Sequence, residues 1–349
     1  MRGIIGYGTY VPYYRLDRSK ITAAMGSGGG RGHRAVAAYD EDTTTMGVEA
    51  ARNALAGSSV TPSSIWFATA NPAYLDKTNA TAIQAALDLP QDTWAVDAGG
   101  SARSAEAAIL GASGTPGVSM AVVSDLRTGN PTSNDESSGG DAAAALIFGD
   151  DDDAPVLAHA LGRAASTGEF LDRYRLPGEG SSRIWEERFG EQAYLALAED
   201  AIERATKAAD VGIEDVDKVV IAGLHARAVR GLSKIAGDKL VDDLTGNIGN
   251  PGTAQLPLLV ASVLDQAAPE ETILCVHLAD GAYASVIRTT DAIATYTPFA
   301  TVESQIEGGS DNLEYNLYLT WRGFLDREPP RRPDPDRPGA PPAFLAEDW

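Results

Sequence analysis

Short apolar runs alternate along this chain with longer segments in which apolar residues recur every three or four positions. A short apolar run bounded by turn residues is typical of a β-strand, and the three-to-four spacing is typical of an amphipathic helix. The predicted strands lie in segments 2–11, 64–70, 119–125, 143–150, 218–224, 272–279 and 283–290. The predicted helices include 43–56, 190–209 and 252–268. Strands that alternate with helices predict an α/β fold with a mostly parallel sheet covered on both faces.

The order of these elements occurs twice. The segment SIWFATANP (64–72) has the same pattern as KVVIAGLHA (218–226), and GGDAAAALIFGDD (139–151) has the same pattern as ADGAYASVIRTTD (279–291). Such a repeat indicates two copies of one unit of roughly 150 residues. We therefore expect a duplicated five-layer αβαβα sandwich with a site between its halves. The predicted N-terminal half covers residues 1–165, and the predicted C-terminal half covers residues 166–325.

Three segments do not fit the repeat. Residues 326–349 are rich in proline, arginine and aspartate, so they form either a disordered tail or an extended arm that docks a partner. The loop from Arg127 to Gly139 is rich in glycine, serine, asparagine and aspartate, which predicts a surface excursion or a partner contact. The glycine-rich stretch 26–35 follows no clear strand, so we interpret it as a mobile loop rather than a phosphate-binding loop.

The composition excludes several functional classes. Acidic residues outnumber basic ones 49 to 28 and the formal net charge is −21, so nucleic acid is an unfavourable partner. No apolar run approaches the length of a membrane helix, and the N-terminal segment lacks the apolar region of a signal peptide. The single cysteine, Cys275, excludes an internal disulfide and a cysteine-based zinc site. We therefore expect a cytoplasmic protein with no metal and no membrane partner.

Six segments, taken together, are similar to those of a known family. They are GIIGYGTYVPYYRL (3–16), DEDTTTMGVEAARNAL (40–55), VVSDLRTG (122–129), GGDAAAALIFGD (139–150), RFGEQAYLALAEDAI (188–202) and NIGNPGTAQLPLLVASVLD (247–265). Their order and spacing over residues 2–295 resemble the hydroxymethylglutaryl-CoA synthase branch of the thiolase superfamily, in its archaeal and bacterial form. Ketoacyl synthase III is a more distant relative. The resemblance implies the same duplicated sandwich, a homodimer, and an acyl-CoA thioester as substrate or ligand.

The resemblance also implies which positions carry the chemistry. Enzymes of this family use a cysteine that becomes acylated, a glutamate that acts as acid and base, and a histidine and an asparagine that hold the thioester oxygen. The histidine corresponds to His225, in GLHARAVRGLSK, and the asparagine to Asn250, in GNPG. Ala102 stands at the cysteine position and Ala70 at the glutamate position. Neither alanine can do this chemistry, so the resemblance implies a degenerate active site.

Other residues near these positions offer alternatives. Ser101 would be the nucleophile if the alignment shifted by one residue, and it would then need His225 as its base. A one-residue shift turns a helical side chain by about 100°, which argues against this alignment. Asp76 follows the glutamate position and could replace it, although the register argues against this too. Cys275 lies in the middle of a predicted strand, so we interpret it as a core residue.

A site of this type without its cysteine still suits an aldol or retro-aldol reaction on an acyl-CoA. Such a reaction needs an oxyanion hole and a proton-transfer group but no thiolate. We expect His225 and Asn250 to hold the thioester oxygen, in a complex with a small OB-fold/zinc-ribbon protein of the kind that accompanies such enzymes. The base is one of His225, Tyr283, Tyr74 and Asp76, and Tyr283 is notable because similar loops carry a small residue there.

Two other functions remain open. The chain could be a non-catalytic subunit that scaffolds an active paralogue or the OB-fold/zinc-ribbon protein, since two catalytic positions are lost together. It could also be an ordinary synthase that acts through Ser101.

Coenzyme A is anionic, so its binding requires a local group of cations in this acidic chain. Arg227, Arg230 and Lys234 follow His225 at spacings of three and four, which places them on one helix face. The resemblance implies that this face binds the CoA phosphates. The alternative interpretation is a solvated helix face.

Overall fold

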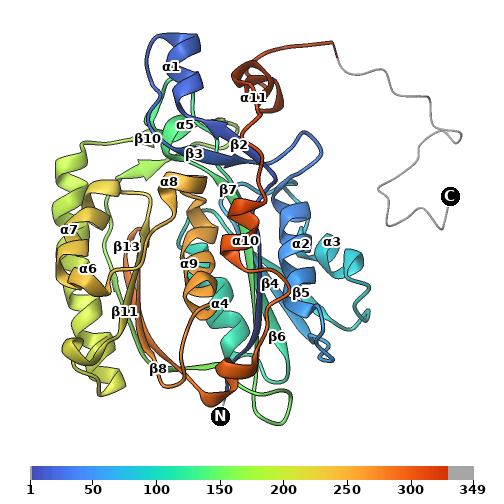
Figure 1. Cartoon of the computed structure of the whole chain (residues 1–349), viewed down its shortest axis with the longest axis vertical. Helices are drawn as coiled ribbons and strands as arrows, with labels where there is room; N and C mark the ends of the chain where they lie inside the picture. The colour runs from blue at the N-terminus through green and yellow to red at the C-terminus, as the bar shows by residue number, and fades with distance from the viewer. Residues whose placement is uncertain (1, 329–349) are drawn as a thin grey trace, which may run out of the picture.

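The protein is represented by a computed structural model, in which the structure of residues 2–328 is described. Within that range nine strands form one sheet, in the order β11-β12-β13-β8-β1-β7-β6-β4-β5 (Figure 1). The N-terminal part of the sheet contains β1 (Gly3–Tyr10), β4 (Ser64–Thr69), β5 (Trp94–Gly99), β6 (Ser119–Leu126) and β7 (Asp141–Gly149). The C-terminal part contains β8 (Ala158–Thr167), β11 (Lys218–Gly223), β12 (Thr272–Leu278) and β13 (Gly281–Thr289).

The two parts of the sheet repeat one strand arrangement. Strands β1, β7, β6 and β4 lie in the same order as β8, β13, β12 and β11. The parts meet where β1 pairs with β8, at the single register pair Ile4 and Ala158. In the N-terminal part of the sheet, β5 lies beside β4. At the corresponding position beside β11 in the C-terminal part, Leu240 forms an isolated parallel bridge with Val219. Because the two parts share one continuous sheet, the division into residues 1–165 and 166–325 stays a prediction.

The sheet is mixed, and the expectation of a mostly parallel sheet is wrong. Parallel pairing is confined to β4 with β5 and β6, and to β11 with β12. The pairs β6–β7, β1–β7, β12–β13 and β8–β13 are antiparallel. For β12 and β13 the reason is that no crossover helix separates them, since a tight turn at residues 279–280 connects them directly. Antiparallel neighbours can be joined in this way, whereas parallel neighbours cannot.

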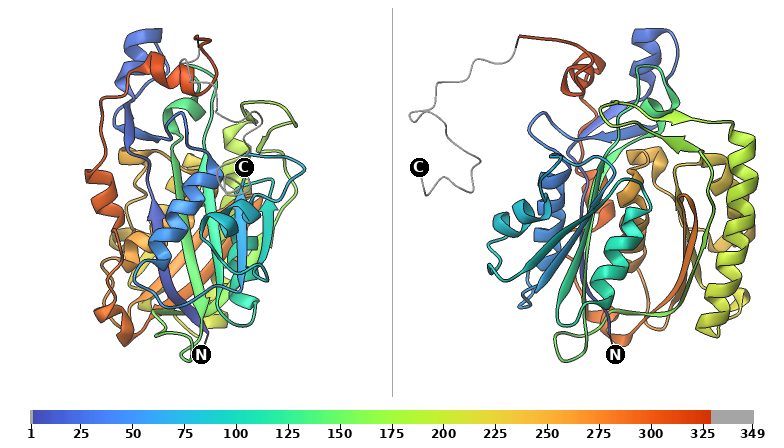
Figure 2. Two further views of the ribbon diagram at one scale, coloured as in Figure 1. Left: turned by 90° about the vertical axis from the view of Figure 1, so that its right-hand side faces the viewer. Right: turned by 180° about the vertical axis from the view of Figure 1, so that it is seen from behind.

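Helices cover both parts of the sheet and also fill the space between them (Figures 1 and 2). The outer layers are α2 (Thr43–Leu55) with α3 (Ala80–Ala86), and α6 (Glu187–Ala209) with α7 (Ala226–Ala236). The middle layer is α4 (Ser104–Gly114) with α9 (Gln255–Leu264). These layers confirm the predicted duplicated five-layer αβαβα sandwich.

The local sequence explains which helices lie inside. Helix α9 is apolar on nearly every side, and a helix of this kind is buried all round. Helix α4 is narrow enough for the middle layer because alanines such as Ala105, Ala108 and Ala112 form its buried surface. Outer helix α2 begins with a capping box in which the side chains of Asp42 and Thr45 each bind the other's backbone N–H.

A buried hydrogen-bonded pair joins the two halves across the middle layer. Glu106 of α4 binds Nδ1 of His277 on β12, and both side chains are almost fully buried. The other carboxylate oxygen and the other ring nitrogen have no partner among residues 2–328. The pair therefore depends on its one shared hydrogen bond.

Glu106→Ala is expected to lower the free energy of unfolding by roughly 3–5 kcal/mol, because it leaves the His277 ring buried without its partner. Urea unfolding followed by circular dichroism measures this. Glu49→Ala on the exposed side of α2 is the control, and it should change the stability by less than about 1 kcal/mol. Equal effects of the two variants would contradict a buried, mutually dependent pair.

The C-terminal segment packs against an N-terminal excursion. Helix α11 (Tyr315–Trp321) shares an apolar cluster with β2 (Tyr14–Asp17), α1 (Ser19–Met25) and β3 (His33–Val36). The remaining elements are α5 (Asn134–Ser138), β9 (Arg173–Tyr174), β10 (Arg183–Ile184), α8 (Thr245–Ile248), α10 (Val302–Glu307) and the 3-10 turns Ile213–Asp215, Gly237–Lys239, Gly252–Ala254 and Asp291–Thr295. The predicted tail lies almost entirely outside the described residues.

The loop from Arg127 to Gly139 reaches the surface at Asn130 and Asn134, but it is also anchored from inside the molecule, and its contact with a partner stays a prediction. Arg34 is fully buried and donates hydrogen bonds to the carbonyl oxygens of Arg127 and Glu136 and to the Tyr318 hydroxyl. Glu136 is itself fully buried. Arg34 belongs to the glycine-rich stretch that the sequence suggested to be mobile, and its charge gave no sign that it would be a core residue.

Candidate functional site

A cavity of about 610 Å3 brings together the two positions that the resemblance singled out. Ala102 lies in the turn before α4, and Ala70 lies just after β4. The segment 172–182, which contains β9 and ends just before β10, forms another wall, and residues 278–280 at the end of β12 form a third. We call this space the Ala102 cavity. The resemblance implied that both alanines stand at the reaction centre, and the structure shows that both line this one cavity.

The turn at Ala102 prepares the start of a helix. The carbonyl oxygens of Ser101 and Ala102 accept hydrogen bonds from the N–H groups of Ser104 and Ala105. The Ala102 side chain is only 7% exposed, so its methyl group closes the cavity wall. Ser101 also lines the cavity.

Backbone groups occupy both ring nitrogens of His225. Nδ1 accepts a hydrogen bond of 3.1 Å from the Ala228 N–H, which caps α7. Nε2 lies 3.0 Å from the Glu187 carbonyl oxygen, so it carries the proton and donates it there. The neutral ring is thereby fixed behind the cavity wall and does not line the Ala102 cavity. A serine nucleophile at Ser101 would lack a free histidine base.

Asn250 lines a neighbouring cavity of about 420 Å3, which we call the Asn250 cavity. Its side-chain nitrogen donates to the Gly223 carbonyl oxygen at 2.8 Å, and its side-chain oxygen accepts from the Gly252 N–H at 2.9 Å. The second amide hydrogen of the side chain has no partner among residues 2–328. Arg127 and Leu224 line both cavities. Ala102 and Asn250 thus lie in adjoining spaces rather than in one pocket.

Asp172 is a site residue that sequence reasoning missed. It lines the Ala102 cavity, and its buried Oδ1 atom accepts no hydrogen bond from any residue in the range 2–328. This oxygen lies 3.9 Å from His225 Nε2. Tyr194 lies beside both groups, and burial together with the Asp172 charge raises the pKa of its phenol. Asp172 follows an irregular stretch with no apolar period, so no pattern in the sequence marked it.

Asp125 fixes the relative positions of the loops that carry Ala70 and Asn250. It is fully buried at the end of β6. One carboxylate oxygen accepts hydrogen bonds from the Thr69 hydroxyl and the Ala70 N–H. The other accepts from the N–H and hydroxyl of Thr253. All of these bonds are structural, so Asp125 is a positioning residue for the cavity walls.

Tyr283 lies in a different cavity, of about 340 Å3, between the two parts of the sheet. Cys275 lines the same space, and burial raises the pKa of each side chain to about 12. Neither residue lines the Ala102 cavity. Two other base candidates, Tyr74 and Asp76, are exposed and are not part of its lining.

The sequence comparisons identify the family of this chain. The hydroxymethylglutaryl-CoA synthase of Pyrococcus furiosus is 31% identical over 336 residues, which are 92% of this chain and 95% of that protein. The chain belongs to the hydroxymethylglutaryl-CoA synthase family. The synthase of Aeropyrum pernix is 30% identical over 350 residues, which cover 93% of this chain and 94% of that protein. No general family model matches the chain.

Solved structures agree with this assignment at the level of the fold. A crystal structure of HMG-CoA synthase complexed with CoA has a TM-score of 0.79 at 17% identity, covering 91% of this chain and 89% of that one. The 3-oxoacyl-(acyl carrier protein) synthase III of Pseudomonas aeruginosa has a TM-score of 0.69 at 19% identity, covering 83% of this chain and 98% of that one. The fold class predicted from the sequence is therefore confirmed.

The three cations predicted to bind CoA in this synthase-family chain lie in different environments. Arg227 forms ion pairs with Glu187 at 3.6 Å and Glu191 at 3.3 Å, so acidic groups of α6 already balance its charge. Arg230 lines the Asn250 cavity, while Lys234 lies one turn further along α7 and is exposed. Arg230 is the cation of the three that faces a cavity.

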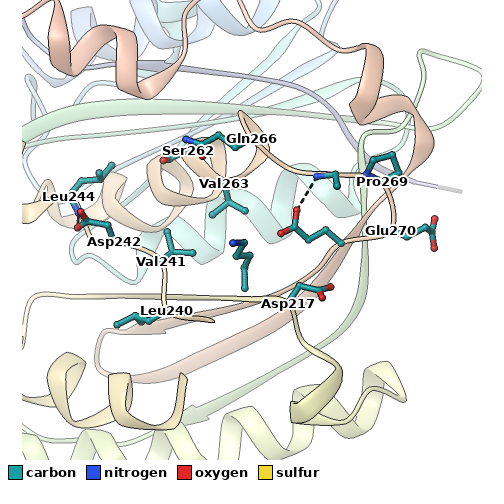
Figure 3. A pocket seen from close by; sticks show the side chains of 13 residues that line it. Asp217, Leu240, Val241, Asp242, Leu244, Ser262, Val263, Gln266, Pro269 and Glu270 are labelled. Carbon is teal, nitrogen blue, oxygen red and sulfur yellow. Dashed lines mark hydrogen bonds between the residues drawn. The ribbon is translucent and has the colours of Figure 1, made fainter. Parts of the chain in front are cut away.

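A larger cavity, of about 710 Å3, lies at the far end of β11 and α9 (Figure 3). It contains none of the residues that the synthase resemblance predicted. Its lining includes the acidic residues Asp217, Asp242, Glu270 and Glu271, against one cation, Lys218. An anionic thioester would be repelled by this surface, so size alone does not make it the CoA site.

The described part of this synthase-family chain contains no group of three histidine, cysteine, aspartate or glutamate side chains placed to hold a metal ion. No helix within residues 2–328 is both long and apolar enough to cross a bilayer.

Proposed function

We propose that this chain binds an acyl-CoA thioester in the Ala102 and Asn250 cavities and performs aldol-type carbon–carbon chemistry without a covalent acyl-enzyme. The observation that carries the proposal is the buried, unpartnered Asp172 oxygen in the Ala102 cavity. A buried carboxylate oxygen that accepts no hydrogen bond is costly to maintain, and a catalytic role is one explanation for such an atom in a folded protein. A purely structural cavity wall would not need one.

Asp172 is the proton-transfer group that best fits this site. Both His225 ring nitrogens are bound to backbone, Tyr283 lies in another cavity, and Tyr74 and Asp76 lie outside the lining. Asp172 would take a proton from the carbon next to the thioester carbonyl. The resulting enolate carbon would bond to the carbonyl carbon of the second substrate, and the alkoxide formed there would take the proton back from Asp172.

The thioester oxygen needs a hydrogen-bond donor while the enolate exists. Asn250 has one amide hydrogen that is not used by Gly223, and it can serve this purpose. His225 would act indirectly, since its ring lies against Asp172 and fixes the carboxylate's surroundings. Arg230 would attract the CoA phosphates toward the Asn250 cavity.

The direct test is exchange of the α-proton. Purified chain is incubated in heavy water with acetyl-CoA or glutaryl-CoA, and mass spectrometry follows deuterium uptake next to the thioester. We expect uptake well above the protein-free rate, with no acyl group attached to the protein. If the chain binds CoA but exchanges neither thioester, alone or with an OB-fold/zinc-ribbon protein, the catalytic proposal fails.

A non-catalytic subunit is the second candidate function. The occupied hydrogen bonds of His225 favour it, and so do exposed apolar side chains around the β9–β10 segment: Leu171 is 57% exposed, Trp185 56% and Phe189 49%. Such a patch suits a protein partner, and an OB-fold/zinc-ribbon protein is the proposed one. The outer edge of β5 has no neighbouring strand within residues 2–328, which suits a homodimer.

A further inference from the structure

The cavity that contains Tyr283, which we call the Tyr283 cavity, is separate from the proposed reaction site. It is lined by strands from both parts of the sheet and by helices α4 and α9. None of its lining residues lines the Ala102 cavity or the Asn250 cavity. Its volume of about 340 Å3 falls within the range of small-molecule sites, which is about 300–1,000 Å3.

Most of the wall of the Tyr283 cavity is apolar. The side chains that α4, α9 and β7 contribute include Ile109, Leu256, Val260, Leu146 and Phe148. Cys275 is buried in the same wall, and burial raises the pKa of its thiol to about 12, so it is uncharged at neutral pH. A space with such walls favours the hydrocarbon part of a ligand over water.

The charges that line this cavity have one sign. Among residues 2–328 the charged lining residues are Arg2 and Arg163, and no acid lines the cavity. Arg2 is held by hydrogen bonds to neutral groups, which include the Ser113 carbonyl oxygen at 2.7 Å and the Ser119 hydroxyl at 2.7 Å. The chain has 49 acidic and 28 basic residues, so a lining with two cations and no acid indicates an anionic ligand.

Arg163 lies at the opening of the Tyr283 cavity. Arg163 and Ala160, both on β8, are exposed lining residues, whereas the lining residues Cys275 and Val260 are buried. The Arg163 guanidinium makes no hydrogen bond and no ion pair with any residue in the range 2–328. The opening is therefore cationic, and the interior is apolar.

Tyr283 adds a hydrogen-bond donor beside Arg163. Burial raises the pKa of Tyr283 to about 12, so the phenol keeps its proton at neutral pH. The Arg163 charge and a hydrogen bond from Ser285 act on this pKa in the opposite direction, so both groups lie close to the phenol oxygen. Glu106 also acts on Tyr283, but its carboxylate is already bound to His277.

We propose that the Tyr283 cavity binds a single-chain carboxylic acid of the medium-chain fatty acid type, with its chain among the apolar residues and its carboxylate at Arg163 and Tyr283. This site lies outside the proposed acyl-CoA site, and the inference does not depend on the proposed function. A guanidinium and a phenol hydroxyl supply the donors that a carboxylate accepts. Burial of the chain in the apolar interior supplies most of the affinity.

The test measures the binding of octanoate, hexanoate and 1-octanol to the full chain by calorimetry. Each buried methylene increases affinity about fourfold, so we expect octanoate to bind roughly fifteenfold more tightly than hexanoate. The charged hydrogen bonds of the carboxylate should make octanoate bind about tenfold more tightly than 1-octanol. Binding of octanoate no tighter than that of 1-octanol would overturn the proposal.

Arg163→Gln should remove the preference for octanoate and leave the affinity for 1-octanol unchanged. Arg288→Gln is the matched control, because Arg288 lies on β13, binds the Thr272 hydroxyl and is not a lining residue. This control should keep the full preference. If the preference survives Arg163→Gln, the carboxylate does not bind at Arg163 and the proposed site is wrong.

Ala160→Phe tests where octanoate binds, because it places a large side chain at the opening of the Tyr283 cavity. It should weaken octanoate at least about tenfold and leave the binding of free CoA unchanged. Ala208→Phe is the control for a new exposed aromatic side chain, since Ala208 is exposed on α6 and is not a lining residue.

Equal octanoate binding by Ala160→Phe and the unmodified chain would place the ligand in another cavity and overturn the proposal. Equal losses in the two phenylalanine variants would also overturn it. Melting curves that match the unmodified chain would show that each variant is folded. Failure of the α-proton exchange test leaves these results unaffected, because it concerns the Ala102 cavity alone.

Discussion

Replacing Asp172 with asparagine is expected to slow α-proton exchange by about 10²–10⁴-fold, the usual contribution of a positioned general base. The amide keeps the size of the carboxylate but cannot take a proton. The buried Oδ1 atom has no hydrogen bond to lose, and the amide can still accept one from the Tyr194 hydroxyl, so the fold should be little affected. Binding of glutaryl-CoA should change by less than the exchange rate does, because Asp172 is proposed to act on the α-carbon and not on the CoA group.

Asp280 provides the control for this variant. It also lines the Ala102 cavity and is an exposed acid at the turn between β12 and β13. Asp280→Asn removes the same amount of charge and should leave exchange nearly unchanged. If Asp172→Asn exchanges as fast as the unmodified chain, the base is another group and the proposed mechanism is wrong. If both aspartate variants lose activity equally, the effect is one of cavity charge rather than proton transfer.

The sequence predicted the layers of the fold because the apolar residues that pack these layers together recur at regular spacings. The three-to-four spacing in 190–209 gives α6 an alanine face against the sheet, and the nearly continuous apolar run in 252–268 gives a helix buried on all sides. The spacing of apolar residues does not show whether neighbouring strands are parallel or antiparallel. For β12 and β13 this depended on whether a helix or a tight turn connects them, which the apolar pattern did not show.

The candidate site was predictable where the resemblance fixed a position along the chain. Ala70 and Ala102 lie in one cavity as expected, because each follows a strand whose end faces the same space. Asp172 and Asp125 could not be predicted, because the importance of Asp172 comes from a missing hydrogen-bond partner and that of Asp125 from the loops that it connects in space. A missing hydrogen-bond partner cannot be read from a sequence.

Tyr283 shows a related limit of sequence reasoning. Side chains alternate between the two faces of a strand, so a one-residue difference decides the face. Tyr283 pairs with His277 across β12 and β13, and it faces the middle layer with Cys275 rather than the end of the sheet where Ala102 lies. The similarity of ADGAYASVI to a catalytic loop located the right turn but not the direction of this side chain.

Ala102→Cys is expected to gain an acyl group when it is incubated with acetyl-CoA, whereas the unmodified chain is expected to gain none. The new thiol would stand in the turn at the N-terminus of α4, where the helix dipole favours a thiolate. The cavity that it would face is the one proposed to receive the thioester. Intact-protein mass spectrometry followed by peptide mapping would locate the adduct.

Ser101→Cys is the control for position, because a neighbouring side chain in this turn points in a different direction. It should be acylated far less than Ala102→Cys, even though Ser101 also lines the cavity. Acylation of Ala102→Cys should itself be slow, since His225 has no free nitrogen with which to activate the thiol. An adduct on Ser101 of the unmodified chain would contradict the proposed register and restore the covalent route. No adduct on Ala102→Cys, in a chain that still binds acetyl-CoA, would mean that the thioester carbon does not reach Ala102, and the aldol geometry proposed for Asp172 would fail with it.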